Sequence, residues 1–455
     1  MALRSVNPAT GELGESFVEQ TEAQVDACVV KAHEAFHGWR RSGFSERRGL
    51  LLRAAKILEL EKKDLARLMS DEMGKPITQA RAEIEKCAMA CVFYAENAEK
   101  MLAPEVVATD MGTSYVRFDP LGTILAVMPW NFPFWQVFRF AAPALMAGNV
   151  CLLKHASNVP GCAQCIGDIF SQAGFPEHVF TTLLIGSNLV EKLIDHPLVC
   201  AVTLTGSEQA GRKVAEQAGR NLKKVVLELG GSDPFIVLAD APMDICLPTA
   251  VNSRMLNNGQ SCIAAKRFIV EESVLDLFRS GFIAAVSALK VGDPFDESND
   301  LGPLARADLV DELERQVKES VRRGATILTG GKRLSDRPGF YFQPTVLGDV
   351  RPGMPAYDQE LFGPVAALIS ARGAYDAVHI ANDTPFGLGA SIWTRDLEQA
   401  EKLAAVVEAG MVFINGLVKS DPRLPFGGVK RSGFGRELSH YGIKEFVNIK
   451  TVVVS

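Results

Sequence analysis

The sequence predicts an α/β protein in which helices cover two separate sheets, and three observations lead to that prediction. The chain has 455 residues, which at roughly 150 residues per domain corresponds to about three structural units. Its composition, with 47% apolar and 22% charged residues, is that of an ordinary folded protein. From residue 122 onward, short apolar runs alternate with helical stretches, which is the pattern of a parallel sheet covered by helices.

Amphipathic helices are expected over the first hundred residues. Val25, Val29 and Phe36 recur at helical spacing, and Leu51 and Leu58 repeat the pattern further along the chain. We expect these helices to act as packing material for the rest of the fold.

Two series of short apolar runs follow, and each run predicts a buried strand. The first series lies at 123–128, 150–153, 180–185, 199–204 and 225–229. After Gly230 and Gly231, the second series lies at 235–238, 267–270, 325–328, 365–370, 390–393 and 411–415. Two series separated by a glycine pair indicate two α/β domains.

Two segments fit neither series. Residues 106–118 have the pattern of a β-hairpin, and residues 446–454 form a short strand near the end of the sequence. Because exposed strands of this kind often pair between subunits, we expect an oligomerisation element and a homodimer or homotetramer.

Charge and cysteine usage exclude several classes of protein. Lys and Arg total 48 against 54 Asp and Glu, which gives a net charge of -6 and no basic face for nucleic acid. The first residues lack a secretory leader and no run of about 18 apolar residues follows, so we expect a cytoplasmic protein without membrane contact. Nine scattered cysteines do not indicate a disulfide framework. Cys162 and Cys165 fit one helix face, with metal or redox chemistry as the alternative, and no metal site is predicted.

Two reactive side chains lie beside turns that contain glycine. Cys262 follows the amide-rich and glycine-containing stretch 257–260, which can present its sulfur to a cleft; the alternative is a buried free cysteine. Glu228 interrupts the apolar run 225–229 directly before the glycine pair. A carboxylate there is either a general base whose pKa is raised by apolar neighbours or a solvated strand end.

An asparagine held between two prolines is the third candidate. Asn131 lies between Pro129 and Pro133, directly after a predicted strand. Because the prolines fix the direction of the backbone, the side-chain amide is free to donate to an oxyanion. The alternative is a rigid corner in which the amide only satisfies local backbone groups.

A glycine turn that leads into a helix is the fourth candidate. Gly206, Ser207 and Gly211 follow the run 199–204, so backbone amides and the dipole of the next helix are available to a pyrophosphate. Plain capping of the helix by Ser207 is an equal alternative. Lys154, at the end of another run, is placed to reach a ribose or a 2′-phosphate, or is a surface lysine.

Together these stretches resemble the aldehyde dehydrogenase superfamily over nearly the whole chain. Residues 7–12, 359–364 and 425–433 resemble further motifs of that superfamily. The resemblance implies an atypical Rossmann cofactor domain, an α/β catalytic domain and a small β oligomerisation element. It places the cofactor domain at 1–104 and 123–229, the catalytic domain at 230–422, and the oligomerisation element at 105–122 and 440–455, with 423–439 returning to the cofactor domain.

The resemblance also implies roles for individual residues. Cys262 is the nucleophile, Glu228 the general base, and Asn131 together with the Cys262 backbone N–H the oxyanion hole. The thiolate forms a thiohemiacetal with the aldehyde, loss of hydride leaves a thioester, and water activated by Glu228 releases the acid. The residues implied to hold NAD or NADP are Trp130, Lys154, Ser157, Gly206, Ser207, Gly211, Leu229, Glu360 and Phe362.

Arg139 distinguishes among the possible aldehydes. The chain looks closest to bacterial succinate semialdehyde dehydrogenases, in which an arginine at this position binds the substrate carboxylate. Arg139 lies eight residues after Asn131, two helical turns along the same face, and its planar fork suits a carboxylate. Ser420 is expected to complete the carboxylate site, and Trp135 and Phe426 to wall the tunnel.

Two positions qualify this picture. Leu256 stands where some succinate semialdehyde enzymes have a second arginine, and Arg254 on the same segment is the candidate replacement. Ser157 stands three residues past Lys154, where many NAD-specific relatives have a glutamate that repels a 2′-phosphate. Serine removes that repulsion and can donate a hydrogen bond, so we expect NADP to be accepted alongside NAD.

Other functions stay open from the sequence alone. A medium-chain or aromatic aldehyde is the rival substrate within the family. Outside it, a thiol esterase or acyltransferase would use the same three side chains without hydride transfer, and a non-catalytic binding protein would keep only the fold. Formation of NAD(P)H on mixing with an aldehyde separates these classes.

Overall fold

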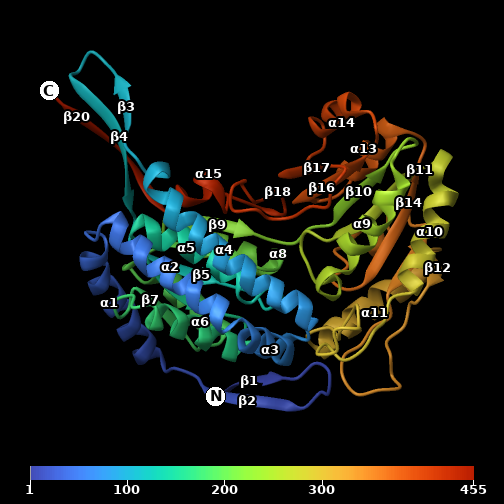
Figure 1. The fold of residues 1–455 in the computed structure, drawn as a ribbon, viewed down its shortest axis with the longest axis horizontal. Coiled ribbons are helices and arrows are strands. Elements are labelled where there is room, and N and C mark those ends of the chain that lie inside the picture. Colours follow the sequence, from blue (N-terminus) through green and yellow to red (C-terminus); the bar gives the residue numbers. More distant parts are fainter. Residues whose placement is uncertain (1) are drawn as a thin grey trace.

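Two sheets form the centres of the two lobes seen in the computed structural model, which describes residues 2–455 (Figure 1). The first is six-stranded, in the order β19-β9-β8-β5-β6-β7, and all its pairs are parallel except that of β19 with β9. Its strands are β5 (Thr123–Val127), β6 (Val150–Lys154), β7 (Phe180–Leu183), β8 (Val199–Thr205), β9 (Lys224–Glu228) and β19 (Gly433–Phe434). These strands confirm all five runs of the first predicted series.

The order of these strands determines where a ligand can bind. From β5 the chain moves outward to β6 and β7, and then returns to β8 on the other side of β5. In a sheet of this type the loops after the two central strands diverge and leave a crevice at their carboxyl ends. The segments after β5 and β8 are those that contain Asn131 and Ser207.

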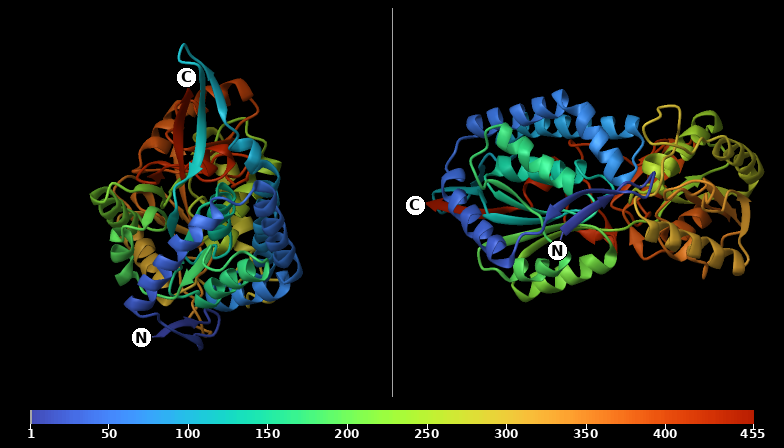
Figure 2. Two further views of the ribbon diagram at one scale, coloured as in Figure 1. Left: turned by 90° about the vertical axis from the view of Figure 1, so that its left-hand side faces the viewer. Right: turned by 90° about the horizontal axis from the view of Figure 1, so that it is seen from below.

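Helices cover both faces of the first sheet, as the right-hand view of Figure 2 shows. Val25, Val29 and Phe36 are buried on one face of α1, as their spacing predicts, and Thr21 begins that helix with a capping box. The helices of this lobe are α1 (Glu22–Trp39), α2 (Phe44–Leu60), α3 (Lys62–Met73), α4 (Ile77–Met101), α5 (Trp135–Ala147), α6 (Pro160–Gln172), η1 (Ser187–Leu189), α7 (Val190–Asp195) and α8 (Glu208–Arg220).

A hairpin precedes these helices, which the sequence pattern did not predict. Strands β1 (Ala2–Val6) and β2 (Leu13–Val18) pair antiparallel, and the turn between them closes with the Gly11 N–H donating to the Asn7 carbonyl at 2.7 Å. Most of β2 is exposed to solvent. Because neither face of that strand is buried, its sequence lacks the alternation by which a strand is recognised.

The second sheet is seven-stranded, in the order β12-β13-β14-β11-β10-β16-β17. It contains all six strands of the second predicted series and one more, β13, with which β12 pairs antiparallel rather than parallel. Its strands are β10 (Asp233–Val237), β11 (Ala265–Glu271), β12 (Thr326–Thr329), β13 (Thr345–Gly348), β14 (Val365–Ala371), β16 (Gly389–Trp393) and β17 (Met411–Ile414). Its helices are α9 (Met243–Met255), η2 (Leu256–Gly259), η3 (Glu272–Val274), α10 (Leu275–Ser287), α11 (Ala307–Arg322), α12 (Pro355–Asp358), α13 (Ala374–Asn382) and α14 (Leu397–Ala404).

A three-stranded arm extends from the first lobe in both views of Figure 2. Strand β20 (Val447–Val454) pairs antiparallel with β4 (Thr113–Pro120), which pairs in turn with β3 (Glu105–Ala108). The predicted hairpin and the predicted strand near the end of the sequence are therefore confirmed, and they belong to one sheet. All four residues of β3 are exposed, which leaves the edge of the arm open.

The chain crosses between the lobes at the glycine pair and returns near its end. Strand β9 ends at Glu228 in the first sheet and β10 begins at Asp233 in the second. After the two-stranded sheet of β15 (Phe386–Gly387) and β18 (Val429–Lys430), β19 rejoins the first sheet ahead of α15 (Ser439–Ile443). The border between the lobes thus collects the ends of β5, β8 and β9 together with the loop before β11.

Two whole-chain features can be stated for residues 2–455. In that range no helix is both long and apolar enough to span a bilayer. The same residues contain no group of three or more His, Cys, Asp and Glu side chains with the arrangement of a metal site. Cys162 and Cys165 lie on α6, where the Cys162 backbone N–H donates to Glu72 at 2.9 Å.

Candidate active site

Cys262 lies in a loop that is folded tightly between η2 and β11. Asn257, Asn258 and Gly259 all have positive φ, at 56°, 58° and 74°. A β-carbon at Gly259 would approach the Gly363 backbone to 2.4 Å, so only glycine fits there. The loop thus holds a strained conformation that amide side chains and one glycine tolerate, and it leaves Cys262 partly exposed.

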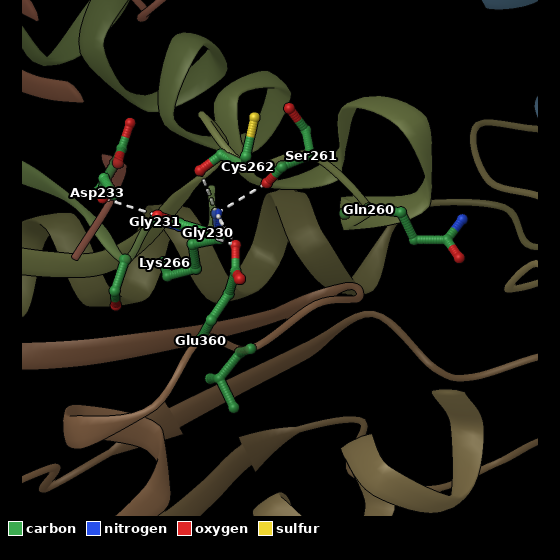
Figure 3. A network of polar contacts seen from close by, with 12 residues as sticks. Gly230, Gly231, Asp233, Gln260, Ser261, Cys262, Lys266 and Glu360 are labelled. Carbon is green, nitrogen blue, oxygen red and sulfur yellow. Dashed lines mark hydrogen bonds and ion pairs between the residues drawn. The ribbon is translucent and has the colours of Figure 1, made fainter. Parts of the chain in front are cut away.

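A buried lysine fixes the carbonyl groups on either side of the nucleophile (Figure 3). The Lys266 ammonium donates to the Ser261 carbonyl at 2.7 Å and to the Cys262 carbonyl at 2.6 Å. It also forms an ion pair with Glu360 at 3.3 Å, and Glu360 accepts a hydrogen bond from the Gly231 N–H at 3.1 Å. In Figure 3 the Cys262 sulfur points away from this network, which leaves it free to react.

Asn131 is joined directly to the same loop. The side-chain amide of Asn131 donates to the Gln260 backbone carbonyl at 3.0 Å. The backbone carbonyl of Asn131 accepts from the side-chain amide of Asn257 at 2.7 Å. Gln136 donates to the Asn131 side-chain oxygen at 3.1 Å, which fixes the amide so that its nitrogen faces the loop. A primary amide carries two N–H groups, so one remains for a substrate oxygen. Among residues 2–455 the Cys262 backbone N–H has no acceptor either.

Glu228 is buried at the end of β9 and its carboxylate is short of partners. The side chain is 2% exposed, and neither carboxylate oxygen has a hydrogen-bond partner among residues 2–455. A β-carbon at Gly427 would lie 2.7 Å from one of these oxygens, so the carboxylate rests against that glycine. Burial raises the pKa of Glu228 well above its usual value, and Glu437 adds to the effect while Arg139 opposes it.

The nucleophile also starts out protonated. Desolvation raises the pKa of the Cys262 thiol to about 12, and the nearby positive charges of Lys266 and Arg139 oppose that rise. A thiol in this state needs a base to take its proton. Glu228, whose own pKa is raised, is suited to accept a proton from sulfur or from water.

The residues expected to hold a nicotinamide dinucleotide lie along the carboxyl ends of the first sheet. Ser207 begins α8 and its hydroxyl accepts from the Ala210 N–H at 3.3 Å, so the capping alternative for this residue is realised. A β-carbon at Gly211 would meet the Leu229 side chain at 2.5 Å, which means that α8 packs closely on the end of β9. Gly206 joins β8 to this helix, whose N-terminus faces the crevice described above.

Lys154 ends β6 and is nearly buried, at 7% exposure. Burial lowers its pKa, and among residues 2–455 no carboxylate forms an ion pair with it. Ser157 is exposed three residues further on. A buried cation without an acid, followed by a neutral hydroxyl, fits an anionic group of a cofactor and offers no repulsion to a 2′-phosphate.

Two residues of the second lobe, Glu360 and Phe362, lie against the residues expected to hold the cofactor. The Trp130 and Phe362 rings meet edge to face, with centroids 5.7 Å apart. Glu360 lies so close to Gly230 that a β-carbon there would be 2.4 Å from its carboxylate. Glu360 therefore contacts both the glycine pair and Lys266, and it links the cofactor residues to the nucleophile loop.

Arg139 lies in the site but does not have the open guanidinium that the sequence led us to expect. It is 2% exposed and forms an ion pair with the buried Glu437, and it donates to the Thr205 hydroxyl at 3.2 Å. Its guanidinium lies 4.5 Å from the centre of the Phe426 ring. The charge of Arg139 is thus already balanced within the protein. Sequence spacing places Arg139 correctly on its helix but does not reveal Glu437, which is distant in the chain.

Trp135 and Ser420 meet through a residue that the sequence analysis missed. The Lys86 ammonium donates to the Ser420 hydroxyl at 2.6 Å and lies 4.3 Å from the centre of the Trp135 ring. Of the four expected substrate residues, Trp135 and Ser420 therefore contact Lys86, and Phe426 contacts Arg139. An exposed-looking lysine on an amphipathic helix gives no sequence signal that it faces a site.

Arg254 does not replace the arginine that is missing at position 256. It is fully buried, at 0% exposure, and its guanidinium donates to backbone carbonyls on both sides of the nucleophile loop. The expectation that Arg254 compensates for Leu256 in carboxylate binding is wrong, because the guanidinium is fully buried and both its terminal nitrogens donate to backbone carbonyls of the loop and of the Leu361–Gly363 segment.

Comparisons with known proteins agree with this geometry. A model of the aldehyde dehydrogenase family matches residues 1–452. A Synechocystis protein named probable succinate-semialdehyde dehydrogenase [NADP(+)] is 55% identical over 455 residues, which is 100% of both chains. A Mycobacterium tuberculosis protein named succinate-semialdehyde dehydrogenase [NADP(+)] 1 is 51% identical over 100% of both chains. The crystal structure of succinic semialdehyde dehydrogenase from Streptococcus pyogenes with NADP+ superposes with a TM-score of 0.97, at 38% identity and 100% coverage of both chains. These findings confirm the expected fold class and the family resemblance.

Proposed function

The chain belongs to the aldehyde dehydrogenase family, and from that membership we propose that it oxidises succinate semialdehyde to succinate with NADP+ as the hydride acceptor. The observation that carries the choice of substrate is the Lys86 ammonium, which donates to Ser420 and has no ion-pair partner among residues 2–455, in a site whose nucleophile is Cys262. A neutral medium-chain or aromatic aldehyde would gain nothing from a cation in that position.

In the proposed mechanism, the first step joins the Cys262 sulfur to the aldehyde carbon. The thiol proton passes to a base as the S–C bond forms, and the carbonyl oxygen becomes an anion. The free N–H of the Asn131 amide and the Cys262 backbone N–H stabilise that anion, because both are fixed before the substrate arrives.

Bound NADP+ supplies the acceptor for the hydride that the thiohemiacetal loses. What remains on Cys262 is a thioester, which this protein must hydrolyse. Glu228 takes a proton from water, the resulting hydroxide attacks the thioester carbon, and the C–S bond breaks to release the acid. The buried carboxylate is a stronger base than an ordinary glutamate because its pKa is raised.

The side chains present fit NADP+ rather than excluding it. Lys154 is a nearly buried cation without an acid partner, and Ser157 adds no negative charge beside it. The N-terminus of α8 and the Gly206 turn supply backbone donors for a diphosphate. We assign Trp130, Phe362, Glu360, Gly211 and Leu229 to the remainder of the cofactor site.

An initial-rate survey tests the proposal. We expect NADPH formation with succinate semialdehyde at a kcat/KM at least about tenfold above that with butanal, since a charge-assisted hydrogen bond contributes roughly 1.5–3 kcal/mol. The survey includes NAD+ and an aromatic aldehyde. A higher kcat/KM with the neutral aldehydes would refute the substrate, and a preference for NAD+ would refute the cofactor.

We also propose that the arm mediates assembly into a homo-oligomer. Strand β3 presents an unpaired edge, and the apolar side chains of Val106, Val453 and Val454 are exposed on the arm. Exposed apolar strands of this kind are normally covered by a partner. Light scattering of the protein, compared with a variant lacking the segment 447–455, gives the oligomeric state.

All nine cysteines are free in the structure. We propose on this ground that the protein works in a reducing compartment such as the cytoplasm. Retention of activity in excess thiol, and loss of activity on oxidation, is the expected behaviour.

A further inference from the structure

Unlike three other cations near the site, Lys86 has no acid partner among the described residues. Lys75 is paired with Glu83, Arg139 with Glu437, and Lys266 with Glu360. Among residues 2–455 no carboxylate lies within ion-pair distance of the Lys86 ammonium. It has two neutral partners instead, the Ser420 hydroxyl and the face of the Trp135 ring.

The side chain of Lys86 is fixed by residues from two other segments of the fold. It lies in the middle of α4, whose face packs on α5, and its ammonium spans from that helix to the loop that contains Ser420. Trp135 is 4% exposed and Ser420 is 8% exposed, whereas Lys86 itself keeps partial exposure. The Lys86 ammonium is therefore held between two fixed groups, the Ser420 hydroxyl and the Trp135 ring.

We propose that Lys86 is the residue that binds the terminal carboxylate of the substrate, with the Ser420 hydroxyl as its second donor. This inference rests on the proposed function and names the residue that gives it specificity. The ligand class is a short aldehyde that carries a carboxylate at its far end. Arg139 supports the site through its field, while Glu437 keeps its guanidinium occupied.

The electrostatics of the position agree with this role. Burial, together with the positive charge of Arg139, lowers the pKa of Lys86 to about 8, while Cys87, Glu83 and Asp421 oppose that shift. A bound carboxylate would favour the charged form of the lysine and offset part of the cost of burying it. A partly buried cation without an acid partner costs free energy, and an anionic ligand that pairs with it lowers that cost.

Replacement of Lys86 by methionine is the central test. Methionine keeps an unbranched apolar stem on Trp135 but removes the charge and the donor. We expect the KM of Lys86→Met for succinate semialdehyde to rise about 10- to 100-fold, the equivalent of one charge-assisted hydrogen bond, with a far smaller change in KM for butanal. Lys86→Arg restores a cation and should recover part of the loss. Lys100→Met, an exposed lysine on the same helix, is the matched control.

Each outcome decides the matter. If wild-type protein turns over butanal but not succinate semialdehyde, the proposed function fails, and this inference fails with it. If wild-type protein prefers succinate semialdehyde and Lys86→Met has an unchanged KM, only this inference is overturned. Equal losses on both aldehydes, with no recovery by Lys86→Arg, assign Lys86 a structural role and also overturn it. Should Lys86→Met not fold, Lys86→Gln is compared with wild type through inhibition by succinate, and equal inhibition overturns the proposal.

Discussion

Replacing Lys266 with methionine tests whether this buried ammonium activates the nucleophile loop as well as holding it. Lys266 is 0% exposed and donates to the carbonyls of Ser261 and Cys262. It is also the first of the charges that lower the pKa of the Cys262 thiol against the effect of desolvation. Removing it should therefore make the thiol still harder to ionise.

The size of the effect follows from the charges around the sulfur. A cation about 6 Å from a thiolate stabilises it by roughly 3 kcal/mol at an effective dielectric constant of 20. Glu360 and Asp233 both attract Lys266 and cancel part of its field at the sulfur. We take the net contribution as about 1.4 kcal/mol, which is one pKa unit and a tenfold change in the thiolate fraction.

The assay is the rate at which iodoacetamide inactivates the enzyme, followed across the neutral pH range. Only the thiolate reacts, so Lys266→Met should be inactivated about tenfold more slowly than wild type at each pH. Lys266→Gln separates the two roles, because it keeps a donor for the carbonyls without the charge. Lys318→Met on the surface of α11 serves as the control. A folded Lys266→Met protein with an unchanged inactivation rate would refute the electrostatic argument.

Four further predictions concern the site. Asn131→Ala should lower kcat by about 10²- to 10³-fold, the effect of losing one oxyanion donor, and an unchanged kcat would remove Asn131 from the mechanism. Glu228→Gln should still release one NADPH per site in a rapid burst but lose steady-state turnover. Because burial raises the pKa of Glu228 above 4.5 and its deprotonated form is the base, wild-type turnover should rise with pH beyond the usual glutamate range, and this limb should vanish in the variant. Ser157→Glu should raise KM for NADP+ at least about tenfold more than KM for NAD+, as measured by initial rates. Arg139→Ala should impair succinate semialdehyde and hexanal alike, since it leaves the carboxylate of Glu437 buried and unpaired; a loss confined to the semialdehyde would show that Arg139 binds the substrate directly.

The strands that are easiest to predict are those buried on both sides. The runs that became β5, β6 and β8 can be recognised without knowledge of their neighbours, because a strand covered by helices on both faces is largely apolar. The N-terminal hairpin and the antiparallel direction of β12 could not be read in this way. Their burial patterns are mostly exposed, so pairing and not burial determines them.

The catalytic trio was easier to predict than its supports. Cys262, Glu228 and Asn131 each lie where a residue type conflicts with its local surroundings, and such conflicts are visible in one sequence. The residues that hold the site in place come from distant parts of the chain, and no feature of the sequence around them indicates that role. Glu437, for example, approaches Arg139 from a segment almost three hundred residues away, and no spacing argument connects the two.

Lys86 shows most clearly why the substrate site needed the fold. On an isolated helix, Lys86 would be expected to pair with Glu83 one turn earlier, since oppositely charged residues three apart attract each other. In the folded chain one Glu83 oxygen accepts from the backbone N–H groups of Phe134 and Trp135 at 3.0 and 2.9 Å, and the other is paired with Lys75. The glutamate is thus used to begin α5, and Lys86 is left without an ion-pair partner among the described residues. The Glu83 contact that positions Trp135 therefore also leaves Lys86 available to an anion. For this reason we expect Glu83→Gln to disturb the start of α5 and, at the same time, to weaken the binding of a carboxylated substrate.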